Sequence, residues 1–158
     1  VSLSNTTAYF YPYYLQNAAT ITGIKWWQGA VSTSNAGTYN GFALYSVSGG
    51  TLTLVASSTN DTTNFKSGAN SWKSKAFSST YSASAGLYYV SALFTTTGAS
   101  LPNIGGAASV SGFGGFGSVD FTNNNKMAGS VSTSSFPSSQ ALSGVGGFGG
   151  NYHALFLY

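Results

Sequence analysis

The stretch Gly41-Phe-Ala-Leu-Tyr-Ser-Val-Ser-Gly-Gly-Thr-Leu-Thr-Leu-Val-Ala56 contains the clearest structural signal in this sequence. Two runs of alternating apolar residues flank the pair Gly49-Gly50, a combination typical of a β-hairpin. Alternate residues of a strand share one face, so each run has a consistent apolar face. The pattern therefore predicts two antiparallel strands, Gly41–Val47 and Thr51–Ala56.

Short runs of the same kind continue on both sides of this hairpin, bounded by Gly, Asn and Ser. The further strands that we predict are Thr7–Leu15, Ala19–Val31, Ser71–Phe77, Leu87–Phe94, Met127–Thr133 and Tyr152–Tyr158. No window has the 3.6-residue apolar period of an amphipathic helix. Many short strands separated by turn residues indicate an all-β protein, an antiparallel sandwich or barrel, and the length predicts a single domain over residues 1–158.

Three of these strands carry additional information. Pro12 interrupts the first strand and predicts that it lies at an edge or a bend. Gly23 and Gly29 are the expected bulge or bend points of the second strand. Leu87–Phe94 is apolar on both faces, which indicates either a central strand or a strand that faces a partner chain.

The composition excludes several classes of function. Only 4% of the residues are charged, against about 25% in an ordinary soluble domain. The five lysines do not form a phosphate-binding stripe, so we expect no nucleic-acid partner. No apolar run is long enough for a membrane helix, and we expect no membrane insertion. The absence of cysteine removes thiol chemistry and cysteine-based zinc sites.

The residues that acid–base catalysis requires are scarce. Asp61 and Asp120 are the only acidic side chains, and His153 is the only histidine. A glycosidase normally needs two positioned carboxylates, and a metal site needs several ligands. We interpret both aspartates as turn or capping residues and His153 as structural. The sequence thus predicts a protein that is not an enzyme, with no cofactor and no metal.

Aromatic residues, by contrast, make up 16% of the chain. Trp26 and Trp27 must point to opposite faces of one strand, so one enters the core and the other faces solvent, a sugar or a neighbouring subunit. The first strand has more aromatic surface than an exposed edge can hold, which favours burial against another copy over a carbohydrate platform. The predicted interface residues are Tyr9, Phe10, Tyr11, Tyr13 and Tyr14.

Loops offer a second set of candidates. The loop Ser57–Asn70 is long, and loops of that length either bind ligands or are solvated excursions. The segments Gly112–Gly117 and Gly146–Gly150 combine glycine with phenylalanine. They are interpreted as turns with buried rings, as close strand crossings at a subunit interface, or as ligand loops. The candidate exposed contact residues are Tyr39, Phe65, Trp72, Phe113, Phe116 and Phe148.

Several runs together resemble bacteriophage virion proteins. The runs are Ile21–Gln28, Asn40–Ser46, Gly49-Gly50, Leu52–Ala56, Trp72, Gly86–Val90, Met127–Ser130, Phe136–Ser139 and Ala154–Tyr158. In order and character they are similar to the final domain of a phage fibre or head-decoration protein. The resemblance spans most of the chain, but it rests on packing residues and transfers no active-site residue.

The resemblance implies a jelly-roll-like sandwich exposed on a virion surface and often trimeric. The expected function is that of a virion structural protein, a fibre-head or capsid-decoration module. Such a module would assemble with copies of itself and other virion proteins, and would attach weakly to host-surface glycan through several sites at once. A purely architectural capsid role needs no ligand. A cellular carbohydrate-binding module or surface adhesin with the same composition is the alternative.

Overall fold

The computed structural model describes residues 3–32, 39–61, 63–95, 100–107, 129–147, 152–153 and 155–158. The longer strands are β1 (Thr7–Leu15), β2 (Ala19–Gln28), β3 (Asn40–Ser48), β4 (Thr51–Ser57), β5 (Ser71–Ala83) and β6 (Gly86–Phe94). The shorter strands are β7 (Gly106–Ala107), β8 (Gly129–Ser132), β9 (Ser139–Ala141), β10 (Gly146–Gly147), β11 (Tyr152–His153) and β12 (Leu155–Leu157). Two single-turn 3-10 helices, η1 (Asn64–Lys66) and η2 (Leu142–Gly144), complete the described elements.

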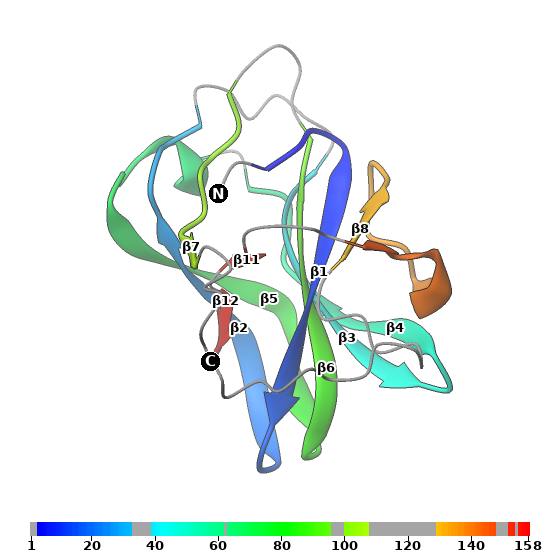
Figure 1. Ribbon diagram of the computed structural model, residues 1–158. Helices are drawn as coiled ribbons and strands as arrows, with labels where there is room; N and C mark the ends of the chain where they lie inside the picture. Colours follow the sequence, from blue (N-terminus) through cyan, green and yellow to red (C-terminus); the bar gives the residue numbers. More distant parts are fainter. Residues whose placement is uncertain are drawn as a thin grey trace.

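The strands form an antiparallel sandwich (Figure 1). One sheet has the order β10-β8-β1-β6-β3-β4-β9, the second has the order β12-β2-β5, and β11 pairs with β7. Among the first six strands the pairs are nested, because β3 pairs with β4, β2 with β5 and β1 with β6. This nesting is that of a rolled-up antiparallel ladder, so the predicted all-β, jelly-roll-like sandwich is confirmed.

The predicted hairpin is the innermost pair of this ladder. Gly49 and Gly50 have φ values of +54° and +76°, and Ser48 pairs with Thr51 across the two-residue turn. A turn with positive φ at both central residues matches the right-handed twist of the strands that it joins. Glycine reaches this conformation without steric cost, which explains why the turn falls here.

Aromatic rings fill the core between the two sheets. The Trp26 indole from β2 lies 4.7 Å from the Phe42 ring of β3 and 5.1 Å from the Phe65 ring of η1. Phe94 of β6 meets the Phe65 ring edge-on at 4.7 Å. All four side chains are fully buried. Their packing connects both sheets with the loop that contains η1.

The opposite face of the seven-stranded sheet is buried as well. Phe10, Tyr45 and other residues of this face form a second apolar cluster. Leu142 of η2 and Val145, which follows it, cover this cluster. Both faces of β6 are therefore covered by apolar side chains of its own chain. The strand lies between β1 and β3, so the interpretation of Leu87–Phe94 as a central strand is the one observed.

The irregular points of the strands follow from single residues. Among the described strands, β6 pairs with the whole of β1, whereas β8 pairs only with Thr7–Phe10 on the other side. The half of β1 that contains Pro12 therefore has one strand partner. The expectation of an edge thus holds for half of β1. The β2–β5 register shifts between Ile21 and Gly23, where a bulge was predicted. A Cβ atom at Gly23 would lie 2.4 Å from the Lys75 carbonyl oxygen, so the close approach there requires glycine.

We expect the protein to lose stability in alkaline solution. Burial raises the pKa of the Tyr11, Tyr45 and Tyr89 hydroxyls above the ordinary value of about 10. Since the unfolded chain ionises these tyrosines near pH 10 and the folded chain does not, their contribution is complete below that pH and falls as pH rises beyond it. Urea unfolding at intervals from about pH 7 to about pH 11 measures this. A free energy of unfolding that stays constant above about pH 10 would contradict it.

Candidate functional site

The outward face of the three-stranded sheet carries a row of exposed aromatic side chains. Trp72 of β5 is 51% exposed, Phe156 of β12 is 45% exposed and Tyr158 is 44% exposed, while Trp27 of β2 is half-buried. The Trp72 ring centre lies 5.7 Å from that of Trp27 and 5.6 Å from that of Phe156. We call Trp27, Trp72, Phe156 and Tyr158 the aromatic row.

Strand register brings the row together from three distant parts of the chain. Trp27 pairs with Trp72, and Lys25 pairs with Phe156. Because successive residues of a strand alternate between faces, the burial of Trp26 in the core directs Lys25 and Trp27 outward. Trp27, Trp72 and Phe156 therefore lie on paired strands, with Tyr158 directly after β12, and this restricts the movement of the row.

Two glycines leave room for the rings of this row. A Cβ atom at Gly105 would lie 2.7 Å from Cδ1 of Trp27, and one at Gly23 would lie 2.7 Å from the Tyr158 hydroxyl oxygen. Any side chain at either position would displace the ring. The aromatic row thus depends on the absence of side chains beneath it as well as on the aromatic residues themselves.

One described lysine contacts the aromatic row, and the others lie elsewhere on β5 and η1. The four described lysines are Lys25 on β2, Lys66 on η1, and Lys73 and Lys75 on β5. Lys25 Nζ lies 5.7 Å from the centre of the Trp72 ring. Lys75 Nζ lies 3.0 Å from the carboxylate of Asp61, which is the one aspartate within the described ranges.

Asp61 organises the loop before β5. Its Oδ1 accepts hydrogen bonds from the backbone N–H groups of Thr63 at 3.0 Å and Asn64 at 2.8 Å. Burial by itself would raise the pKa of this carboxyl, but the two N–H donors and Lys75 outweigh it and lower the pKa below its ordinary value. The predicted turn or capping role is confirmed for Asp61, whereas Asp120 lies outside the described residues.

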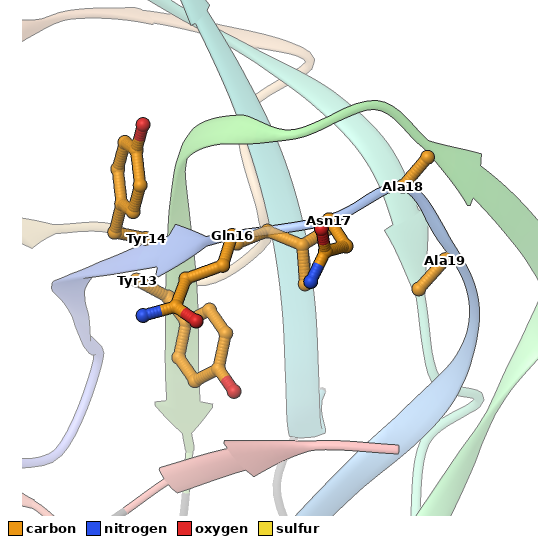
Figure 2. Close-up of a pocket in the computed structure, with 7 residues that line it drawn as sticks. Tyr13, Tyr14, Gln16, Asn17, Ala18 and Ala19 are labelled. Carbon is orange, nitrogen blue, oxygen red and sulfur yellow. The ribbon is translucent and has the colours of Figure 1, made fainter.

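A hollow at the turn between β1 and β2 is a second feature of the surface (Figure 2). It has a volume of about 460 Å³ and is wide open to solvent. Figure 2 shows that Tyr13 and Tyr14 point to opposite sides of the strand, with Gln16 and Asn17 beside them. Ala19 in this hollow is eight positions before Trp27 along β2, or roughly 25 Å of extended strand, so the two features are separate.

The predicted exposed contact residues have different outcomes. Trp72 is exposed, as expected, and belongs to the aromatic row. Phe65 is fully buried against Trp26, so its prediction as an exposed contact is wrong. Tyr39 is half-buried, with its hydroxyl donating to the Ser58 carbonyl and its ring against Phe136. The remaining three candidates, Phe113, Phe116 and Phe148, lie outside the described residues.

The predicted subunit interface on the first strand requires correction. Tyr9 and Tyr11 are buried in the core between the sheets, and Phe10 is buried in the cluster on the opposite face. All three are covered by their own chain, so they offer no surface to a partner. Tyr13 is half-buried, and Tyr14 is 69% exposed at the β1–β2 turn.

Sequence reasoning found part of the aromatic row and missed the rest. It indicated that one indole of the Trp26-Trp27 pair faces outward, but it did not identify Lys25, Phe156 or Tyr158. The alternation in Leu155–Tyr158 was the available signal, since leucines at the first and third positions leave Phe156 and Tyr158 on the other face. The pairing of β12 with β2 could not be inferred from that local pattern.

No three His, Cys, Asp or Glu side chains lie close enough to hold a metal ion in the part of the chain that the structure describes. His153 lies in β11, which pairs with β7. None of the helices in the described ranges is long and apolar enough to cross a membrane. No family model matches the chain, and the comparisons with curated proteins and with solved structures found no match. Function is therefore inferred from the surface of the fold.

We expect Asp61→Asn to destabilise the protein in a pH-dependent manner. The substitution removes the charge that strengthens two N–H hydrogen bonds and the ion pair with Lys75, at a cost of about 1–3 kcal/mol near neutral pH. Since the pKa of Asp61 is lowered by folding, its contribution is complete above the unfolded value of about 4 and is lost as the pH falls through the folded value.

Urea unfolding of the parent and the variant, at neutral pH and at several acidic pH values, measures the difference in stability. Ser74→Ala is the matched control, because Ser74 is exposed on the neighbouring strand and its side chain is not part of the ion pair. A difference between parent and Asp61→Asn that does not shrink in acid would contradict the assignment.

Proposed function

We propose that this protein is a non-enzymatic surface module of a bacteriophage virion that attaches to host-surface carbohydrate through the aromatic row. The exposure of Trp72 and Phe156 on one sheet face is the observation that supports this most strongly. Aromatic rings combine a flat apolar face with, in Trp and Tyr, a polar edge, a combination that suits the ring and hydroxyl groups of a sugar. Because paired strands already hold the aromatic rings in place, binding costs little further conformational entropy.

The rest of the molecule is compatible with a scaffold role. Asp61 is committed to loop hydrogen bonds and to Lys75, which supports a function other than acid–base catalysis. A rigid sandwich with buried aromatic residues on both faces of its larger sheet suits a module exposed on a particle. The resemblance of the sequence to fibre-head and capsid-decoration proteins supports the virion location.

Several copies acting together would compensate for weak individual sites. We expect a homotrimer associated with other virion proteins, in which three aromatic rows engage one cell surface and gain avidity through effective concentration. Since Tyr9, Phe10 and Tyr11 are buried within the chain, the contacts between copies must use other residues. Sedimentation velocity of the purified protein would measure the number of subunits.

A cellular carbohydrate-binding module or surface adhesin is the second candidate, because the same aromatic row would serve it equally. Location distinguishes the two functions. Mass spectrometry and immunogold labelling of purified virions should find the protein at a constant copy number on the particle. Its absence from particles, together with retained glycan binding, would favour the cellular function.

We expect Trp72→Ala to weaken carbohydrate binding at least tenfold, since loss of a central aromatic contact typically costs more than 1 kcal/mol, about 1.4 kcal/mol per tenfold. The parent is first screened on an array of bacterial surface polysaccharides. The variant is then titrated against the best ligand by calorimetry.

Tyr14→Ala is the matched control for this experiment, because it removes an aromatic side chain at the distant β1–β2 turn that is more exposed than Trp72. The control should bind like the parent, and thermal unfolding should show that both variants are folded. Unchanged binding by Trp72→Ala, or equal losses in both variants, would refute the aromatic row as the attachment site.

A further inference from the structure

The aromatic row has an exposed cation, Lys25, beside it and no side-chain carboxylate among its described residues. Lys25 lies next to Trp27 in alternation along β2 and pairs with Phe156 of β12. Its Nζ atom is 5.7 Å from the Trp72 ring centre, within the range of a cation–π contact. Lys25 therefore presents its charge at the centre of the row.

No acidic side chain in the described part of the chain forms an ion pair with this lysine. Asp61, the one described aspartate, is buried and forms its ion pair with Lys75. Lys73 and Lys75 alternate with Trp72 along β5 and therefore lie on the other face of that strand, so Lys25 is the lysine that contacts the row. The positive charge of Lys25 beside the Trp72 ring favours an anionic partner over a cationic one.

We infer that the aromatic row binds an acidic polysaccharide, with sugar rings on Trp72 and Phe156 and a sugar carboxylate paired with Lys25. The inference rests on the proposed function and specifies its ligand class. A uronic acid has an apolar ring face and a carboxylate on adjacent atoms. The short separation between the Trp72 ring and the Lys25 ammonium therefore allows one sugar residue to contact both.

A single ammonium group favours a carboxylate over more highly charged ligands. Nucleic acids are held by many cations along their backbone, whereas Lys25 is the one lysine among the described residues that contacts an aromatic ring of the row. Lysine acts as a point charge and does not form the two-pronged contact that arginine makes with phosphate. One positive charge among aromatic rings thus matches a polymer with one negative charge per sugar.

The test compares two polymers that share a backbone. Polygalacturonate has one carboxylate per sugar, and its fully methyl-esterified form has none. We expect the parent protein to bind polygalacturonate more tightly than the ester. Raising the ionic strength from about 0.1 M to about 1 M, which shortens the Debye length from about 10 Å to about 3 Å, should remove most of that difference.

Variants assign the effect to residues. Lys25→Gln should lose roughly three- to tenfold in affinity for polygalacturonate and bind the ester as the parent does, whereas Lys25→Arg should retain binding. Trp72→Ala should weaken binding of both polymers. Lys66→Gln is the matched control, because it removes one exposed lysine that lies on η1 rather than on the row, and it should bind like the parent.

The outcomes separate this inference from the proposed function. Equal binding of both polymers, or equal losses in Lys25→Gln and Lys66→Gln, would overturn the acidic specificity and leave carbohydrate attachment in place. Binding of neutral array glycans without any binding of polygalacturonate would also overturn the acidic specificity and leave carbohydrate attachment in place. Absence of binding to every carbohydrate tested would overturn both, and a selective loss in Lys25→Gln supports both.

Discussion

The packing of Trp26 against Phe42 and Phe65 is the contact on which the rest of the molecule depends. It connects β2 of the smaller sheet, β3 of the larger sheet and the η1 loop in one buried aromatic cluster. Because residues alternate along a strand, the inward position of Trp26 also requires Lys25 and Trp27 to face outward. The packing of the core therefore determines which side chains of β2 face solvent.

The burial of both faces of the larger sheet by one chain explains the low charge of this sequence without contacts to other copies. Aromatic residues crowd both faces of β1 and β6, a pattern that suggests burial against other copies when only the strands are considered. Segments around Leu142 and Val145 cover the second face within the same chain. Among the described residues, most large apolar side chains are buried by folding, and the exposed large ones are Trp72, Phe156, Tyr158 and Tyr14.

Local patterns predicted the long strands well and their partners poorly. The predicted strand Tyr152–Tyr158 is wrong as a single element, because its described residues form β11 and β12 in different sheets. The strand Thr7–Leu15 and the Gly49-Gly50 turn are as expected, because alternation and glycine act over a few residues. The predicted strand Ser71–Phe77 continues to Ala83, since its hydroxyl-rich second half pairs with the start of β2. Phe65 was misplaced because a polar loop gives no local sign that one of its residues enters the core.

The sequence by itself determined the fold class, the approximate strands and the rule that Trp26 and Trp27 face opposite ways. Only the tertiary structure decided which indole is buried, which chain segments cover the larger sheet, and that Phe156 lies beside Trp72. The physical reason is that alternation is a local property of the extended backbone, whereas the burial of a face depends on pairing between residues far apart in the chain. Lys25 joined the candidate site for the same reason, through the register of β2 with β12.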